Sequence, residues 1–370
     1  MTDKDTTGTS MGSGISRRQF ASVAGTAAVG AVAGCLGSDA QTIRVAAWSG
    51  TYAENFEEGV VDPFREETDH EVEVIPEWAE MLSRVRSAPE DNPPFDLMSA
   101  HGDFLLRGAA DDLFAEVDLD NIPNLDTVYP HLRNEFRTEY LEYGVPTDGA
   151  SYAIVYDESN VDFTPTDWTD FLRDEVDSGA LEAGFWTDTI STVAVMTGEA
   201  EGANELYDEQ YHDALIGVLE ELDENHIEAW TAGGAELWEN LRQEVVNMGM
   251  SYTGSGWVET DDNDDWEIVT PSVTSGYFDH FVRVRGTDEK KEAVEEFMNH
   301  MLDPEIQERW YESGNVLLAS EEAEYDSRGE ETYPTSNDEM ETMLSGFPNF
   351  QQLQPHYDTL NEQFSEIVYE

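Results

Sequence analysis

The sequence has very little cysteine and very little positive charge. Its 370 residues contain one cysteine, Cys35, so no disulfide can form within the chain. Lysine and arginine together number 18 against 81 aspartate and glutamate residues, which gives a formal net charge of −63 at pH 7. Because the few basic residues are far outnumbered by acids and cannot neutralise phosphate groups, we expect no binding to nucleic acid.

The surplus of acid is spread along the chain rather than gathered in a tail. Such a surface repels itself in dilute buffer, but at molar salt the Debye length falls to about 3 Å and most of the repulsion is screened. The composition therefore resembles that of proteins from extreme halophiles. An acidic disordered protein is the competing interpretation, and it fails because 9 Trp, 15 Tyr and 16 Phe residues supply enough material for a core.

The apolar stretch near the N-terminus is too short to span a membrane. Arg17 and Arg18 precede residues 21–34, which carry no charge and consist mostly of Ala, Gly and Val. A spanning helix needs about 20 strongly apolar residues. A basic pair followed by a short apolar run with small residues at its end predicts a secretory signal over residues 1–34. The segment Ser-Arg-Arg-Gln-Phe resembles the twin-arginine export motif, whose route carries folded proteins.

Cys35 directly follows this segment. Residues 32–35, Val-Ala-Gly-Cys, resemble the lipobox of secreted lipoproteins, in which the cysteine thiol receives a diacylglyceryl group after cleavage. The alternative is that Cys35 is only a small residue in a leader peptide. Two lipid chains are enough for lasting attachment. We therefore expect the mature protein to stay on the outer face of the cell membrane, with no thiol left for a disulfide or a metal.

The first part of the mature chain alternates strands with helices. The predicted elements are, in order, strand 43–48, helix 52–67, strand 70–75, helix 78–87 and strand 95–99. This alternation is typical of a doubly wound α/β lobe with a parallel sheet. Because ligands of such sheets bind beyond the carboxyl ends of the strands, residues 48–52 and 99–101 are expected at the same rim.

The rest of the chain continues with mixed elements. The predicted ones are strand 150–156, a helix opening at 166–172, helices 215–222 and 237–246, strand 248–252, a turn at 253–256, strand 268–271, an extended segment at 280–285, and helices 290–300 and 304–312. Residues 261–265, four acids around an asparagine, are predicted to form a solvated loop, since they lack the spaced ligands and glycine of an EF-hand loop. The length favours two α/β lobes of ordinary domain size.

No recognisable arrangement of reacting groups occurs in the sequence. It has no His-Glu-x-x-His segment and no Gly-x-Ser-x-Gly elbow, and acylation of Cys35 would leave no cysteine nucleophile. The eight histidines are scattered without ligand spacing. His280 beside Asp279 is a suggestive pair, but adjacent residues of a strand face opposite ways. We therefore expect no enzymatic activity, no metal and no other cofactor.

Several short segments follow one another in a recognisable order between Ile43 and about Ser320. They are the opening strand with Trp48 and Tyr52, Gly144-Val145-Pro146, Asp167 to Phe171, Gly249 to Gly254, Gly276 to Asp279, and Ala293 to Glu305. Their order and spacing resemble the polyamine-binding branch of the solute-binding proteins of ABC transporters. The chain is similar to spermidine- and putrescine-type receptors with the type II periplasmic-binding fold, in the form of a haloarchaeal lipoprotein.

This resemblance implies a monomer of two α/β lobes joined by crossing hinge strands, with the ligand held in the cleft between them. The implied lobes are residues 41–147 with 272–312, and residues 148–271 with 313–370. The crossings would fall near residues 146–150 and 271–277. Closure over the ligand is a hinge motion. The closed form would be recognised by an ABC permease that a separate ATPase drives.

The resemblance also implies which residues bind the ligand. Asp279 matches the family's acidic ligand residue, and Tyr277, two positions earlier, matches an aromatic one. Tyr252, Trp48 and Tyr52 match further aromatic positions, although the acid that the family places between the last two is replaced by Ser-Gly-Thr. Aromatic faces surround a methylene chain and attract ammonium groups, and carboxylates pair with them. The alternative for each aromatic residue is a place in the core.

Three more positions bear on the ligand. Ser99 and His101 match a Ser-x-aromatic turn of the family, where His101 either donates to a ligand or caps a helix. In residues 186–192, where polyamine binders offer paired acids, Asp188 is the one acid. A dication held by one carboxylate would be under-compensated in a partly desolvated cleft. We expect a polyamine as the ligand, with a monoamine, a zwitterion or a non-amine solute as alternatives. The partner is expected to be a permease, and the alternative is a chemotaxis transducer that recognises the closed form.

Overall fold

A mixed sheet of ten strands runs through residues 40–369, the part of the chain that this computed structural model describes. The strands are β1 (Thr42–Trp48), β2 (Glu71–Glu77), β3 (Leu97–Ala100), β4 (Gly144–Asp157), β5 (Gly179–Glu182), β6 (Ile227–Thr231), β7 (Met248–Tyr252), β8 (Trp266–Val269), β9 (Gly276–Arg283) and β10 (Leu317–Leu318). Their order is β2-β1-β3-β9-β4-β7-β5-β6, with β8 and β10 both paired to β4. The predicted signal, with Arg17, Arg18 and Cys35, lies outside the described residues.

Helices cover both faces of this sheet. They are α1 (Thr51–Phe56), α2 (Asp62–Glu67), α3 (Met81–Ser87), α4 (Gly102–Ala110), α5 (Pro130–Asn134), α6 (Trp186–Thr197), α7 (His212–Asn225), α8 (Gly234–Arg242), α9 (Thr253–Asp261), α10 (Lys291–Met301), α11 (Pro304–Gly314), α12 (Ser327–Thr332), α13 (Asn337–Leu344), α14 (Phe350–Leu353) and α15 (Tyr357–Tyr369). Shorter 3₁₀ segments are Leu119–Asn121, Pro123–Thr127, Thr138–Tyr140, Trp168–Leu172, Asn204–Tyr207, Glu209–Tyr211 and Asp288–Lys290. No helix within residues 40–369 combines the length and the apolar character that crossing a membrane requires.

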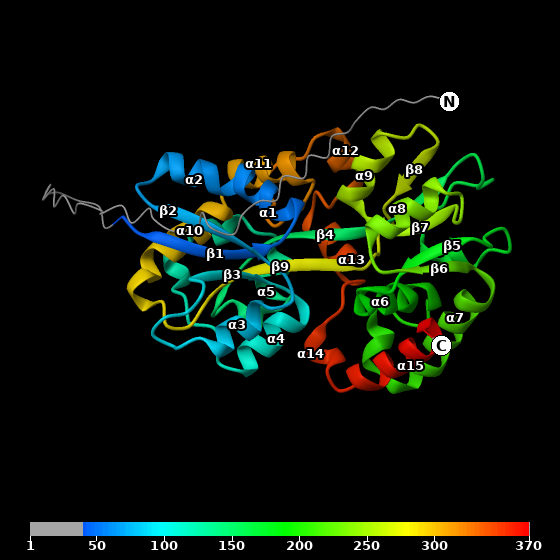
Figure 1. Cartoon of the computed structure of the whole chain (residues 1–370), viewed down its shortest axis with the longest axis horizontal. Helices are drawn as coiled ribbons and strands as arrows, with labels where there is room; N and C mark the ends of the chain where they lie inside the picture. The colour runs from blue at the N-terminus through cyan, green and yellow to red at the C-terminus, as the bar shows by residue number, and fades with distance from the viewer. Residues whose placement is uncertain (1–39, 370) are drawn as a thin grey trace, which may run out of the picture. The chain divides into compact units, whose positions relative to one another are not determined.

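The first half of the sheet is the α/β arrangement that the sequence predicted. β1 pairs in parallel with β2 and with β3. Side chains alternate along β1, so Ile43, Val45 and Ala47 pack into one core while Ala46 and Trp48 pack into another. Figure 1 shows α1, α2 and α11 over one face of these strands and α3 and α4 over the other.

The carboxyl ends of β1 and β3 meet at one edge, as predicted. Val45 pairs with Leu97 in the parallel register, so the final residues of the two strands, Trp48 and Ala100, lie close together. β9 runs antiparallel to β3, and its first residues, 276–279, extend past the end of β3 at this edge. Side chains of β1, β3 and β9 therefore lie together at this edge of the sheet.

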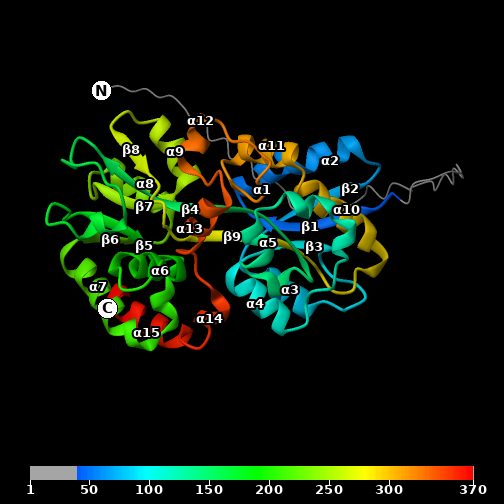
Figure 2. The same cartoon turned by 180° about the vertical axis from the view of Figure 1, so that it is seen from behind.

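The second half of the sheet contains β5, β6, β7 and β8. β5 pairs in parallel with β6 and β7. Ile154 and Tyr156 of β4 pack in the core that contains residues of α6, α7 and α15, whereas Val155 packs with α8. Figure 2 shows α6, α7 and α15 over one face of these strands and α8 and α9 over the other.

β4 belongs to both halves. Its residues 144–151 pair with β9, and residues 152–157 pair with β7 or β8. The C-terminal segment connects the halves again: side chains from residues 316–347 contribute to the first core, and side chains from residues 353–364 contribute to the second. The lobe boundaries expected from the sequence stay a prediction.

The helix predicted over residues 52–67 is present, but its middle part is π-helical and not α-helical. A π-helical segment, Glu57–Val61, separates α1 from α2 and ends two residues before Pro63. Proline offers no N–H to the carbonyl four residues earlier and its ring crowds that carbonyl, here that of Gly59. The wider π turn relieves both problems. Gly59 also lets α11 approach, since a Cβ there would lie 2.8 Å from the Cα of Trp310.

Two other predictions about local structure differ from the fold, and one helix was not predicted. The turn predicted at residues 253–256 is wrong, because these residues form the first turn of α9. The helix expected to open at 166–172 is only a short 3₁₀ segment. Conversely, residues 186–197 form α6, which the sequence did not predict, because Thr, Ser, Val and Ile have low intrinsic helix propensity. Burial of eight of its residues stabilises this helix instead.

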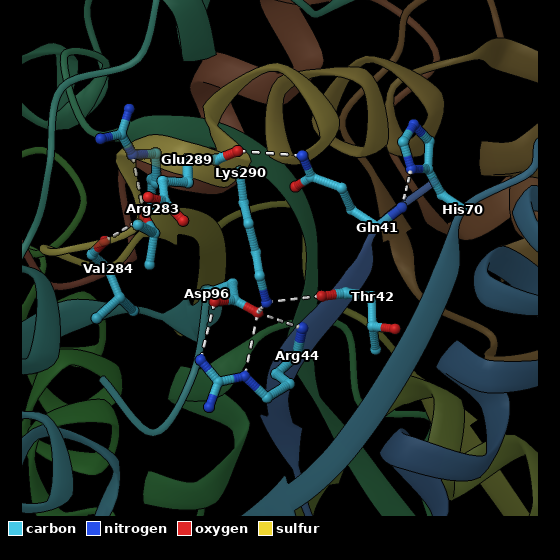
Figure 3. A network of polar contacts seen from close by, with 10 residues as sticks. Gln41, Thr42, Arg44, His70, Asp96, Arg283, Val284, Glu289 and Lys290 are labelled. Atoms are coloured by element: carbon cyan, nitrogen blue, oxygen red, sulfur yellow. Dashed lines mark hydrogen bonds and ion pairs between the residues drawn. The ribbon is translucent and has the colours of Figure 1, made fainter. Parts of the chain in front are cut away.

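A network of ion pairs lies at the N-terminal end of β1 (Figure 3). Asp96, which is 1% exposed, accepts hydrogen bonds from Arg44 at 3.0 and 3.2 Å and from Lys290 Nζ at 2.7 Å. Lys290 also donates to the carbonyl of Thr42. Burial alone would raise the pKa of Asp96, but the bonds from Arg44 and Lys290 outweigh it and hold the pKa below its ordinary value. The network ties β1, the start of β3 and the start of α10 together.

Candidate functional site

A cavity of about 330 Å³ opens where the carboxyl ends of β1 and β3 meet. Its lining residues are Trp48, Ser49, Thr51, Tyr52, Trp78, Ala79, His101, Phe104, Phe185, Tyr252 and Tyr277. The sequence singled out five of them as ligand residues: Trp48, Tyr52, His101, Tyr252 and Tyr277. The other three expected residues, Ser99, Asp188 and Asp279, do not line the cavity. Both halves of the sheet contribute to its wall.

Aromatic rings form much of this wall. The ring of Trp48 lies 4.9 Å from that of His101, and His101 stacks on Tyr277 at 5.0 Å, centroid to centroid. Tyr277 meets Tyr252 edge to face at 5.5 Å, and Tyr252 stacks on the buried Tyr152 at 4.2 Å. The predicted residues Trp48, His101, Tyr252 and Tyr277, which come from four separate segments of the sequence, therefore form one continuous aromatic surface.

Trp78 and Phe185 join this surface without having been predicted as ligand residues. Trp78 was expected to begin a helix over residues 78–87, but the helix begins at Met81 and Trp78 is 48% exposed. Its ring lies 5.7 Å from Trp48 and 6.0 Å from Phe185. Phe185 directly precedes α6, so this contact links the first half of the sheet to the second. A tryptophan directly after a predicted strand was the signal that the sequence offered.

Asp279 of β9 lies behind the aromatic wall and is fully buried. Its Oδ2 accepts hydrogen bonds from Trp48 Nε1 at 2.6 Å and Ser99 Oγ at 2.7 Å, and its Oδ1 lies 2.7 Å from His101 Nδ1. Since a carboxylate can only accept, Nδ1 of His101 carries a proton. Four of the predicted site residues thus form one hydrogen-bonded unit.

His101 does occupy the N-cap position of α4, one of the two roles foreseen for it. Its side chain, however, makes no capping hydrogen bond to the helix. The next residue, Gly102, has φ +52°, and a Cβ there would lie 2.6 Å from the ring of Phe350. The sharp turn at this glycine lets the chain enter α4 while the His101 ring turns back toward Asp279.

Asp148 is a second fully buried acid, directly opposite Asp279 in the register of β4 and β9. Its carboxyl group accepts hydrogen bonds from Tyr52 at 3.1 Å and from Thr147 at 2.8 Å. Burial, and then the charge of Asp279, raise the pKa of Asp148 well above its ordinary value. Sequence reasoning missed Asp148. A Thr-Asp pair next to Pro146 in an otherwise apolar strand was the signal that could have revealed it.

Asp188 lies in the first turn of α6 and is 7% exposed. No hydrogen-bond donor from the described residues binds its carboxylate, and burial raises its pKa to about 7 against the opposing effect of His101 and Arg137. Glu182, at the end of β5, accepts a hydrogen bond from Tyr152 at 3.1 Å, and burial raises its pKa to about 7 as well. Glu182 was not predicted. These two acids belong to the second half of the sheet.

Arg137 places a buried positive charge beneath the site. Its guanidinium group donates to the carbonyls of Phe278 at 2.9 Å and Pro348 at 3.2 Å. Burial lowers its pKa to about 10, although nearby acids including Asp279 and Asp188 oppose this. Arg137 thereby connects the loop before β4 to β9 and to the C-terminal segment. No pattern around Arg137 in the sequence predicts this role.

A second cavity, of about 580 Å³, shares part of its wall with the first. The shared residues are Thr51, Tyr52, Tyr252 and Tyr277. Its other lining residues are both polar and apolar, and they include Asn55, Trp238 and the ion pair of Arg242 with Glu259.

A group of possible metal ligands lies outside both cavities. His131, Glu135 and Glu341 bring one ligand atom each to within 4.8 Å of one another. Both glutamates are exposed, and His131 Nδ1 lies 3.9 Å from Glu135. Within residues 40–369 this is the arrangement of His and acidic side chains that comes nearest to a metal site.

Comparison with known sequences gives one match. The profile of the family described as "Bacterial extracellular solute-binding protein" matches residues 59–332. No curated protein matches the sequence.

Many solved structures share the fold. An extracellular solute-binding protein from Bordetella parapertussis aligns with a TM-score of 0.74 and 18% identity, over 88% of this chain and 98% of that one. The spermidine/putrescine ABC transporter substrate-binding protein PotD from Streptococcus pneumoniae aligns with a TM-score of 0.72 and 19% identity, over 89% of this chain and 100% of that one. AgtB from A. tumefaciens R10, solved with agropinic acid, aligns with a TM-score of 0.68 and 13% identity, over 90% of this chain and 100% of that one. At these identities the likeness concerns the fold.

Proposed function

Because the chain belongs to the family of bacterial extracellular solute-binding proteins, we propose that it captures a small amine-bearing solute outside the cell and delivers it to an ABC permease. The observation that carries this proposal is the aromatic cavity at the carboxyl ends of β1 and β3, with the buried Asp279 hydrogen-bonded to two of its lining residues, Trp48 and His101. Aromatic faces attract cations, and buried acids compensate the charge of a cation that leaves water.

A polyamine or a related amine is the proposed solute class. A cavity of about 330 Å³ suits a molecule with a short methylene chain, and rings such as Trp48 and Tyr277 offer it faces to pack against. The likeness of the fold to PotD supports this class. The fold is also similar to that of AgtB, which was solved with agropinic acid, so the binding experiment includes zwitterionic and other solutes. Trp48, Tyr52, His101, Tyr252 and Tyr277 keep their proposed role as ligand residues.

Ligand binding is proposed to hold the two halves together. Trp78 and Phe185 come from different halves and meet at 6.0 Å beside the cavity. Residues 146–150 and 271–277 are the proposed hinge, since the register of β4 against β9 shifts between Pro146 and Asp148 and β9 begins at Gly276. A solute that contacts both halves favours the closed form, which the permease would recognise.

The protein is proposed to act at the outer face of the membrane. Arg17 and Arg18 would direct it through the twin-arginine route, and a lipid on Cys35 would retain it afterwards. A monomer tethered in this way stays close to its permease without a spanning helix.

A thermal-shift screen of the mature chain in molar salt tests the proposal. The panel is putrescine, spermidine, amino acids, betaines and short peptides. We expect at least one amine to raise the melting temperature, with a shift that grows with concentration as linkage requires. A shift with anionic or neutral solutes alone would refute the amine class, and the absence of any shift would contradict the binding role.

A further inference from the structure

The wall of the aromatic cavity contains no carboxylate. Among residues 40–369, those that line this cavity of about 330 Å³ include no aspartate, glutamate, lysine or arginine. Seven of the lining residues are tryptophan, tyrosine or phenylalanine, and an eighth is His101. A solute in this cavity therefore meets ring faces and a few hydroxyl groups, but no acid with which to form a direct ion pair.

The rings of this wall stand at steep angles to one another. Trp48 meets Trp78 at an interplanar angle of 76° and Phe104 at 85°, with ring centroids 5.7 and 5.3 Å apart. Tyr252 meets Tyr277 at 85°. Because neighbouring rings are nearly perpendicular, their faces point in different directions, and the wall bends around the cavity as the sides of a cage do.

Asp279 places a negative charge behind this cage without offering it an acceptor. Its carboxylate accepts hydrogen bonds from Trp48 and Ser99 and lies 2.7 Å from His101 Nδ1, and none of its surface is exposed. These three partners leave little of the roughly four acceptor positions of a carboxylate. The charge still acts at a distance, since it raises the pKa of Asp148. Asp279 therefore attracts a cation in the cage but gives no oxygen atom to it.

An ammonium group that carries N–H donors is poorly matched to such a wall. A primary ammonium has three N–H donors, and burial costs them their hydrogen bonds to water unless acceptors replace these. A trimethylammonium group has a permanent charge and no N–H donor to satisfy. Cages of aromatic faces bind such quaternary ammonium groups, because each face attracts the positive charge.

We propose that the solute carries a methylated ammonium group, such as the trimethylammonium group of choline or of a betaine, and that ring faces of the cage bind it in place of a carboxylate. The inference rests on the proposed function and narrows its solute class. It also gives a ligand role to Trp78, Phe104 and Phe185, which the family resemblance did not indicate. Phe185 belongs to the second half of the sheet, so a cation held between it and Trp48 contacts both halves.

Pairs of solutes that differ only in methylation are the first arm of the test. Isothermal titration of the mature chain in molar salt compares ethanolamine with choline, glycine with glycine betaine, and putrescine with its trimethylammonium derivative. In the pair that binds most tightly, we expect the methylated member to bind at least about tenfold more tightly than the other. An analogue of that solute in which a neutral tert-butyl group replaces trimethylammonium should bind about tenfold more weakly, because the attraction to ring faces needs a charge.

Substitution of Phe185 is the second arm. Phe185→Leu keeps an apolar side chain but removes a ring face, so the affinity for the methylated solute should fall about 3- to 30-fold, and the preference over the tert-butyl analogue should shrink. A general loss of packing would instead weaken the binding of solute and analogue equally. Phe163→Leu is the matched control, because Phe163 is also a partly exposed phenylalanine of the second half and lines neither cavity. It should bind as the native chain does.

The outcomes separate this inference from the proposed function. Tighter binding of putrescine, spermidine or another unmethylated amine than of every methylated solute would overturn the inference and leave the function standing. So would equal affinity for the methylated solute and its tert-butyl analogue, or native affinity in Phe185→Leu. Failure of the native chain to bind any of these solutes or any member of the thermal-shift panel would contradict the proposed function itself.

Discussion

Asp148 of β4 and Asp279 of β9 are directly opposite each other in the pairing of the two strands, and neither side chain is exposed. Two buried carboxylates in such proximity cannot both ionise without a large cost in free energy. Their hydrogen bonds distinguish them, because Asp279 accepts from Trp48, Ser99 and His101 whereas Asp148 accepts from two hydroxyl groups. Burial, and then the charge of Asp279, raise the pKa of Asp148, so Asp148 keeps its proton well above the pH range in which an aspartate ordinarily ionises.

This assignment predicts that Asp148→Asn stabilises the protein near neutral pH. A buried acid with a raised pKa contributes stability while it is protonated, and that contribution is lost as the pH rises above the pKa of the unfolded chain. An amide avoids this loss, so the free energy of unfolding at pH 7 should rise by about 1 kcal/mol, and by less at pH 4.5. Denaturant unfolding of the ligand-free protein at both pH values measures this. A loss of stability at both would show that Asp148 is ionised in the fold.

Asp96→Asn should have the opposite effect. The pKa of Asp96 is held below its ordinary value by Arg44 and Lys290, so its contribution is present above the pKa of the unfolded chain and disappears as the pH falls through the folded pKa. Because Asp96 is buried while both partners are partly exposed, we expect a loss of about 2–3 kcal/mol at pH 7. The difference from the native chain should shrink on acidification. A difference that is the same at pH 7 and at pH 3 would contradict this.

Gly102→Ala should destabilise the protein by more than Gly198→Ala. Both glycines have positive φ, +52° and +64°, and each substitution therefore costs about 1 kcal/mol through the backbone. A Cβ on Gly102 would also meet the ring of Phe350 at 2.6 Å, whereas one on Gly198 meets nothing within 4 Å. Thermal unfolding of the two variants isolates the steric part. Equal losses would mean that Phe350 moves aside freely.

Trp78→Ala should weaken solute binding and leave the ligand-free protein nearly as stable as before. The residue is 48% exposed, so little core packing is lost, but its rings contact Trp48 and Phe185 beside the cavity. We expect an affinity about 3- to 30-fold weaker, from loss of an aromatic face. Val245→Ala removes another exposed apolar side chain elsewhere and is the control. A large drop in melting temperature would instead make Trp78 a structural residue.

Cys35→Ser should release the protein into the medium. The thiol is the proposed attachment point of the lipid, and the apolar segment before it is too short to serve as an anchor. Fractionation of cells that express the native and the variant chain, followed by immunodetection, gives the distribution. Retention of the variant in the membrane fraction would refute lipid anchoring at this residue.

Local patterns in the sequence were sufficient to predict the first half of the sheet. Alternation of strands and helices placed the ends of β1 and β3 at one rim, and Trp48 and His101 do meet there at 4.9 Å. Such a prediction needs only the parallel register of neighbouring strands. Tyr252 and Tyr277 were anticipated through the family resemblance, and they complete the same aromatic surface.

The features that escaped prediction depend on contacts between distant segments. The proximity of Asp148 to Asp279 requires the register of β4 against β9, including the irregularity after Pro146. The carbonyls that hold Arg137 come from segments more than a hundred residues away. α6 was missed for a related reason: its residues favour extended structure locally, and burial in the assembled second half makes them helical.

The order of the strands has a consequence for synthesis of the chain. β3 takes its neighbour from β9, with Ser99 beside Phe281, and the core of the first half receives side chains from as late as Phe347. A ribosome that has made the first half of the polypeptide has therefore not yet made the strand that completes that part of the sheet. Folding must wait until translation is nearly finished, and pairing between such distant segments is slow. The twin-arginine route proposed for this chain carries folded proteins, so it is compatible with folding that is completed only after translation.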